Sequence, residues 1–158
     1  MFLNSYLMKR LLVFGLGLSL SFAALSQDIY LKDGVYYEGN KPYSGPYSNY
    51  YESGRIKMRC YFSNGYPDKS VIYYFENGNV SQSGFYDDGD QDGLWSLFNQ
   101  NGEKVGEAHY VDGKKDGIWT LWDENGNQRY HMMYRHGQKV GNWQLWDDQA
   151  SLVSEKNF

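Results

Sequence analysis

Aromatic, glycine and polar residues recur along this chain with a fixed period. Ten-residue segments that begin at Gly45, Lys69, Gly93, Gly117 and Gly141 follow one pattern, and their starts are 24 residues apart. A large apolar residue lies two residues after each start, an aromatic residue lies five after, and Tyr or Phe lies seventeen after. A period of this length is typical of one supersecondary unit that is repeated, with each copy packing on its neighbours.

Each unit is predicted to form a β-hairpin. Segments such as Trp95-Ser96-Leu97 alternate large apolar with polar residues, the period of a strand with two distinct faces. The following Asn-Gly pairs, as at Asn101-Gly102, favour type I′ turns with positive φ at both central residues. The predicted fold is therefore all-β, an elongated antiparallel meander of tandem 24-residue hairpins. The predicted units are a capping hairpin with an initial strand at 27–44, and five repeats at 45–68, 69–92, 93–116, 117–140 and 141–158.

The position of the turn determines which residues of a hairpin face each other. When residues are counted outward from the turn, Trp95 lies opposite Ala108 and Trp119 lies opposite Met132. A large residue therefore faces a smaller one, as close packing requires. The same count places an aromatic residue over a strand glycine. The predicted pairs are Gly45 with Phe62, Gly93 with Tyr110, Gly117 with Tyr134 and Gly141 with Phe158.

This register places one set of aromatic residues on each face of the sheet. The predicted structural core of the repeats consists of Tyr47, Trp95, Trp119, Trp143, Tyr86, Tyr110 and Tyr134. A second row, the aromatic strip, is predicted on the opposite face and consists of Tyr50, Tyr74, Phe98, Trp122 and Trp146. Since each hairpin adds two strands, successive strip residues are expected roughly 10 Å apart. The strip is either a second packing surface or a binding surface for a peptide, a partner sheet or a glycan.

The first 26 residues are predicted to be a signal peptide. Lys9 and Arg10 precede the apolar run 11–25, which is too short for a membrane span, and small residues predict cleavage near Ser26 and Gln27. Losing two cations would change the net charge of −4 to −6. A mildly acidic chain without a basic patch is not expected to bind nucleic acid, and membrane association has no support in the sequence. We expect a secreted or periplasmic protein.

The chain shows no pattern typical of catalysis, a cofactor or a metal. Residues 88–93 have the Asp-x-Asp-x-Asp-Gly opening of a calcium loop, but Asn99 occupies the position of the bidentate Glu. The three histidines lack zinc-ligand spacing: His109, His131 and His136. Cys60, the single cysteine, falls in a column of small or apolar residues and is predicted to pack against its neighbours.

The sequence of residues 93–102, Gly-Leu-Trp-Ser-Leu-Phe-Asn-Gln-Asn-Gly, and its counterpart at 117–126 resemble the MORN repeat. They are more similar to the bacterial variant seen in proteins named as antitoxins of the YwqK type. The resemblance covers 41–158 and is weakest in the second unit, where Lys69 and Val71 replace Gly and Trp. It implies a meander of hairpins that acts as a scaffold for proteins or lies near membranes. The antitoxin name implies a protein toxin as partner.

We therefore expect a non-catalytic, exported repeat scaffold that mediates protein–protein interaction, with an antitoxin-like or immunity-like role as its narrower form. A carbohydrate-binding or envelope-binding protein that uses the aromatic strip is the alternative. The partner, the exposed face and the oligomeric state stay open at this point.

Overall fold

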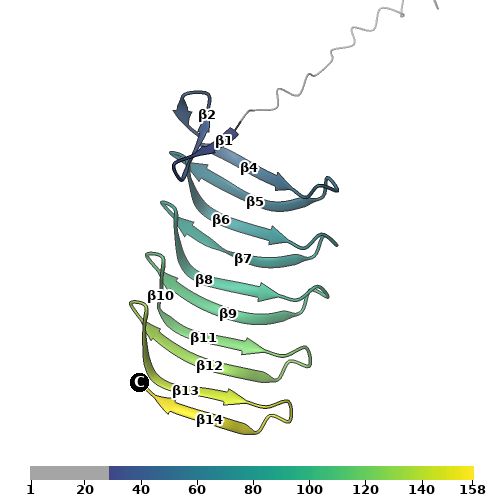
Figure 1. Ribbon diagram of the computed structural model, residues 1–158, viewed down its shortest axis with the longest axis vertical. Helices are drawn as coiled ribbons and strands as arrows, with labels where there is room; N and C mark the ends of the chain where they lie inside the picture. The colour runs from purple at the N-terminus through teal and green to yellow at the C-terminus, as the bar shows by residue number, and fades with distance from the viewer. Residues whose placement is uncertain (1–28) are drawn as a thin grey trace, which may run out of the picture.

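The computed structural model describes residues 29–158, and this part of the chain is built from strands and turns (Figure 1). The predicted signal peptide lies outside the described residues. The strands are β1 (Ile29–Lys32), β2 (Val35–Glu38), β3 (Lys41–Pro42), β4 (Gly45–Tyr50), β5 (Ile56–Ser63), β6 (Tyr66–Tyr74), β7 (Val80–Asp87), β8 (Asp90–Phe98), β9 (Lys104–Val111), β10 (Lys114–Lys115), β11 (Gly117–Trp122), β12 (Gln128–Arg135), β13 (Gln138–Trp146) and β14 (Leu152–Asn157). Within these residues there is no helix of the length and apolarity that a membrane span requires.

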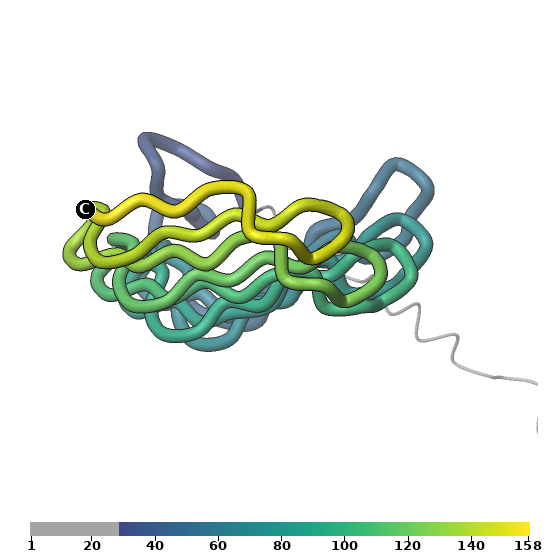
Figure 2. Tube along the Cα trace, turned by 90° about the horizontal axis from the view of Figure 1, so that it is seen from below, coloured from purple at the N-terminus to yellow at the C-terminus, as the bar shows by residue number. Residues whose placement is uncertain are grey.

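The strands form a small sheet of β1, β2 and β3 and an antiparallel sheet of eleven strands. In the large sheet strands that follow one another in sequence lie side by side, except that the short β10 pairs only with β9, and β11 pairs with β9 as well. The large sheet is a single layer that extends along the long axis of the molecule, from β4 near the N-terminal hairpin to β14 (Figure 1). Seen along this axis, the strands are bowed rather than flat (Figure 2). The predicted all-β meander of hairpins is confirmed.

The predicted register is also confirmed. Trp95 lies opposite Ala108, and Trp119 lies opposite Met132. The glycine–aromatic pairs are present as Gly45 with Phe62, Gly93 with Tyr110 and Gly117 with Tyr134. In the last hairpin the backbone N–H of Phe158 donates to the Gly141 carbonyl at 2.9 Å, and the reverse bond measures 3.1 Å. The hairpin count made from the sequence is therefore correct for these pairs, but it is wrong by one residue at the pair next to each loop, as where Phe98 pairs with Lys104 instead of Val105.

The predicted type of turn at the Asn-Gly pairs is wrong. At Asn77-Gly78 the N–H of Gly78 donates to the Phe75 carbonyl at 2.9 Å, and the N–H of Phe75 donates to Asn79 at 2.8 Å. Gly78 has φ +95°, whereas Asn77 is not among the residues with positive φ. These bonds describe a three-residue loop, a turn followed by one left-handed glycine, instead of a two-residue type I′ turn.

A β-bulge explains why the register survives this longer loop. Tyr74 pairs with Val80, but the next pair is Tyr73 with Gln82, so Ser81 is an extra residue on the second strand. The extra residue offsets the change in loop length. The same shift recurs in each hairpin, next to Tyr50, Phe98, Trp122 and Trp146.

Type I′ turns are present at the opposite end of the sheet, where one repeat passes into the next. Both central residues have positive φ there, for example +44° at Asp88 and +95° at Gly89. The other turns of this kind between repeats are Asn64-Gly65, Asp112-Gly113 and His136-Gly137, and Asp33-Gly34 has the same geometry between β1 and β2. The segment that resembles a calcium loop is therefore the β7–β8 turn and the start of β8.

Packing concentrates on one face of the large sheet. There, seven rings form a continuous row, which we call the ladder: Tyr86, Trp95, Tyr110, Trp119, Tyr134, Trp143 and Phe158, with successive centroids 5.0–6.2 Å apart. Trp95 is buried, whereas the other tryptophan and tyrosine rings of the ladder are half-buried and Phe158 is exposed. The predicted core residues other than Tyr47 therefore belong to the ladder, and solvent reaches most of them. Tyr47 packs instead on Phe62, with 5.1 Å between ring centroids.

The N-terminal hairpin covers one end of this packed face. Tyr36 on β2 packs on Phe62 with 4.5 Å between ring centroids, and its backbone N–H donates to Gly65 at 2.9 Å. Gly65 is needed there, because a Cβ at this position would lie 2.3 Å from Cγ1 of Val35. At the other end, every residue of β14 is exposed. One end of the sheet is thus capped within the chain, and the C-terminal edge strand is open.

Candidate functional site

The aromatic strip lies on the face opposite the ladder, near the three-residue loops. Strand alternation separates the two rows, since Trp95 and Phe98 are an odd number of residues apart on β8. Tyr50 is 55% exposed, and the other four strip residues are half-buried. The role of the aromatic strip in binding stays a prediction.

Hollows lie beside the strip where consecutive hairpins meet. One, of about 390 Å³, lies between Arg55 and Arg59 of the first repeat and Tyr74 of the second. The next, of about 400 Å³, lies between Ile72 of the second repeat and Phe98 of the third. A strip ring thus lines each of these two hollows, which lie one repeat apart. Shallow, regularly spaced hollows suit side chains of an extended ligand better than one compact small molecule.

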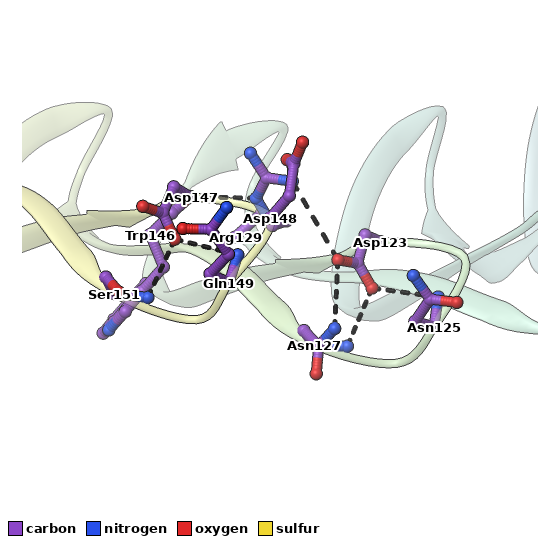
Figure 3. Close-up of polar contacts among 9 residues, drawn as sticks. All are labelled: Asp123, Asn125, Asn127, Arg129, Trp146, Asp147, Asp148, Gln149 and Ser151. Atoms are coloured by element: carbon purple, nitrogen blue, oxygen red, sulfur yellow. Dashed lines mark hydrogen bonds and ion pairs between the residues drawn. The ribbon is translucent and has the colours of Figure 1, made fainter.

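The loops next to the strip are held by polar side chains (Figure 3). Asp123 Oδ1 accepts the backbone N–H groups of Asn125 and Asn127, both at 2.9 Å. These bonds favour the ionised carboxylate, so the N–H of Asn127 above all holds the pKa of Asp123 below its usual value. Asn99 and Asp147 accept equivalent bonds in their own loops.

Arg129 joins the last two loops (Figure 3). Its Nε donates to the Trp146 carbonyl at 2.8 Å, and its Nη1 bonds to Asp148 and lies 3.9 Å from Asp123 Oδ2. Links from a side chain to the carbonyl of the next loop also occur earlier, from Arg55 to Glu76 at 2.7 Å. These links hold the loops they join at a defined distance and so help to position the strip residues beside them.

A row of exposed apolar residues on the strip face was missed in the sequence. We call it the apolar row, and it consists of Tyr61, Phe85, Leu94 and Ile118, which are 37%, 43%, 44% and 46% exposed. Leu94 and Ile118 directly precede ladder tryptophans, so alternation alone would have placed them on the opposite face. The sequence signal for this row is that Leu94 and Ile118 are apolar, whereas a position that alternates with Trp95 or Trp119 on a solvent-facing side is expected to be polar.

The histidines and the cysteine of the described residues lie apart from one another. Among residues 29–158 no group of three or more His, Cys, Asp or Glu is placed to hold a metal ion. His136 lies 3.8 Å from Asp116, and the Asp116 carboxylate accepts the backbone N–H of His136 at 2.8 Å, which is a turn contact. Cys60 is half-buried and packs against the cluster of Val71 and Trp95, and burial raises the pKa of its thiol to about 11.

Comparison with known proteins identifies the repeats. The family model described as MORN repeat variant matches residues 43–64, 67–88, 91–112 and 115–136. No curated protein matches the chain significantly. Among solved structures, a chain in the crystal structure of a GtfA/B complex bound to UDP and GlcNAc aligns with 68% of this chain and 21% of its own length, at 14% identity and a TM-score of 0.28. A match this weak supports no conclusion about fold or function.

Proposed function

Because the chain belongs to the MORN repeat variant family, we propose that it is an exported, non-catalytic scaffold that binds another protein along its single-layered sheet. MORN repeats are generally found in scaffolds that bind proteins or membranes, and the family is typically non-catalytic. Export rests on the signal-peptide pattern of residues 1–26.

The observation that carries the proposal is the large apolar surface on both faces of one layer. Domains normally bury the apolar face of a sheet against a second layer. In residues 29–158 the large sheet has no such layer beyond the N-terminal hairpin, so the aromatic strip, the apolar row and every ladder ring except Trp95 reach solvent. Exposed apolar surface of this extent is typical of protein-interaction sites.

A test is chemical cross-linking of the full chain in its native organism, followed by immunoprecipitation and reconstitution with the purified partner. A scaffold recovers the same protein in independent preparations, and that protein then binds the purified chain saturably. A glycan array tests the carbohydrate-binding alternative. Glycan hits without any recovered protein would overturn the proposal in favour of that alternative.

The two candidate surfaces of the strip face need separate variants. Trp122→Ala with Trp146→Ala tests the aromatic strip, and Leu94→Ser with Ile118→Ser tests the apolar row. Leu31→Ser is the control, because Leu31 is more exposed than Leu94 and Ile118 but lies in the N-terminal hairpin. Circular dichroism separates unfolding from loss of binding: a strip variant that cannot fold shows that the strip is core.

An antitoxin-like or immunity-like role is the narrower form of the same proposal, and the recovered partner tests it. A toxin whose activity the purified chain inhibits supports that role. A recovered partner without toxic activity leaves the scaffold proposal intact and contradicts the immunity role.

A further inference from the structure

Three lysines lie over the ladder in the C-terminal half of the sheet. Lys115 Nζ is 4.2 Å from the ring centroid of Trp119 and 5.0 Å from that of Tyr134. Lys139 Nζ occupies the equivalent position one repeat later, 4.4 Å from Trp143 and 5.2 Å from Phe158, and Lys156 Nζ is 4.6 Å from Phe158. Cations therefore line the half of the ladder that the N-terminal hairpin leaves open.

These ammonium groups are not neutralised by the chain. Within residues 29–158, salt bridges within 4.0 Å involve Lys104, Arg129 and His136, but none of the three ladder lysines. All three are exposed, in a protein whose net charge is −4. A local group of unpaired cations on an acidic protein favours an anionic ligand at this place.

The spacing of the cations limits the shape of such a ligand. Lys115 and Lys139 are one repeat apart, which is two strands or about 9.6 Å across the sheet. A polyproline II helix rises about 3.1 Å per residue with three residues per turn, so side chains at i and i+3 lie on one side about 9.3 Å apart. An extended β-strand cannot match this spacing, because its residues i and i+3 point to opposite sides. Aromatic rows are also the surfaces on which polyproline II segments dock.

An apolar hollow beside the lysines provides a place for an anchoring side chain. It has a volume of about 240 Å³ and is lined by Tyr130, Met132, Trp143, Leu145 and Lys156 among others. Lys156 closes one side, so an apolar side chain in the hollow would lie next to an anion that pairs with this lysine. Buried apolar anchors flanked by charges are a common arrangement in peptide recognition.

We propose that the ladder face around Lys115, Lys139 and Lys156 binds an acidic, proline-rich segment of a partner protein in the polyproline II conformation, with carboxylates three residues apart. The inference rests on the proposed scaffold function and adds the chemistry of one partner segment. Two carboxylates three residues apart pair with Lys115 and Lys139, and a further carboxylate pairs with Lys156. The proline rings pack on the half-exposed aromatic rings between them.

Fluorescence anisotropy tests this with two labelled 15-residue probes of identical composition. One is (Glu-Pro-Pro) repeated five times, and the other carries its five glutamates in one block. We expect the periodic probe to bind the full chain more tightly, with an affinity that falls as salt rises. Equal binding of the two probes would show that charge alone acts and would overturn the proposal, as would no binding at low salt.

Lysine variants locate the site. The triple variant K115Q/K139Q/K156Q is expected to lose affinity for the periodic probe on the order of tenfold, at roughly 0.5 kcal/mol for each exposed charge pair. Its arginine counterpart K115R/K139R/K156R keeps the charge and is expected to bind. Lys114→Gln is the matched control, since Lys114 is an exposed neighbour on β10 whose side chain alternates away from that of Lys115. A triple variant that binds as well as the control would refute the site.

The proposal of an acidic binding segment can fail while the proposed scaffold function stands, and the experiments distinguish the two results. A protein partner that binds the triple glutamine variant as tightly as the wild type leaves the scaffold function standing and refutes the acidic segment. An acidic polysaccharide that displaces the periodic probe at a lower concentration than unlabelled peptide also refutes it, because the ligand would then belong to another class.

Discussion

Gly84 is the position where the packing of the ladder is tightest, and Gly84→Ala tests it. A Cβ at this residue would lie 2.3 Å from Cδ2 and 2.4 Å from Cε2 of Trp95. The indole cannot move aside freely, because Trp95 is 3% exposed, its Nε1 donates to the Phe85 carbonyl at 3.2 Å, and Tyr86 packs on it at 5.2 Å between centroids. The ring must therefore shift by about 1 Å to restore ordinary carbon–carbon contact.

The expected cost follows from these contacts. Overpacking of a rigid core costs about 1–3 kcal/mol, and losing the indole hydrogen bond costs about 1 kcal/mol more. Replacing a strand glycine by alanine returns about 0.5–1 kcal/mol through the unfolded state. We expect the free energy of unfolding to fall by about 1–3 kcal/mol, which lowers the Tm of a domain this size by about 4–10 °C.

Urea unfolding followed by tryptophan fluorescence measures the change, with Gly106→Ala as the matched control. Both glycines lie within strands and lack positive φ, but a Cβ at Gly106 would meet Cδ2 of Leu121 at 2.9 Å, the movable end of a side chain. The control is expected to change stability by less than about 1 kcal/mol. In a Trp95→Val background, Gly84→Ala should become nearly neutral. Equal stability of the two single variants would refute the proposed packing of Trp95 on Gly84.

Three further predictions follow from individual residues. Ala150 has φ +57° at the loop position where the other repeats carry glycine. Ala150→Gly should therefore raise the free energy of unfolding by about 0.5–1 kcal/mol in urea melts, and Gly126→Ala at the equivalent position of the preceding loop should lower it. Burial raises the pKa of the Cys60 thiol from 9.0 to about 11, so this thiol should react with iodoacetamide at pH 8 about 100-fold more slowly than an unperturbed thiol. A reaction rate equal to that of a model peptide would contradict the burial of Cys60. Because the pKa of Asp123 is lowered on folding, its contribution to stability is complete above the unfolded value of 3.8 and is lost as pH falls through the folded pKa. The Asp123→Asn variant should therefore lose less stability than the wild type between about pH 4 and 2. Parallel acid-unfolding curves of the two proteins would refute this.

The periodicity of the sequence was sufficient to predict the hairpins and their register. Columns of matched residues at one spacing define the repeat, and the pairing of Trp95 with Ala108 then follows from the position of the turn. The turn type was wrong because the Asn-Gly pair was considered without the two residues before it. Asp123 lies three residues before Gly126, and Asp at the first and Gly at the fourth position favour a type I turn. Its side chain accepts the loop N–H groups, which stabilises the longer loop.

The binding surfaces could be predicted only in part. Alternation identifies which residues share a face, but it cannot show whether a second layer covers that face, because exposure depends on the arrangement of the whole chain. The aromatic strip was recognised as a row, whereas the half-burial of Trp122 and Trp146 became visible only in three dimensions. Lys115 and Lys139 recur one repeat apart in the sequence, but their place over the ladder depends on the geometry of the turns between repeats, which periodicity does not reveal.

The most direct test of the single-layered sheet is the solvent accessibility of its five tryptophans. Incorporation of 5-fluorotryptophan gives one ¹⁹F NMR resonance for each, and a soluble gadolinium chelate broadens those that solvent reaches. The structure predicts that Trp95 alone is protected, while Trp119, Trp122, Trp143 and Trp146 are broadened. Protection of Trp119 and Trp143 in the free protein would mean that another layer already covers the ladder, and the account of an open binding face would be wrong.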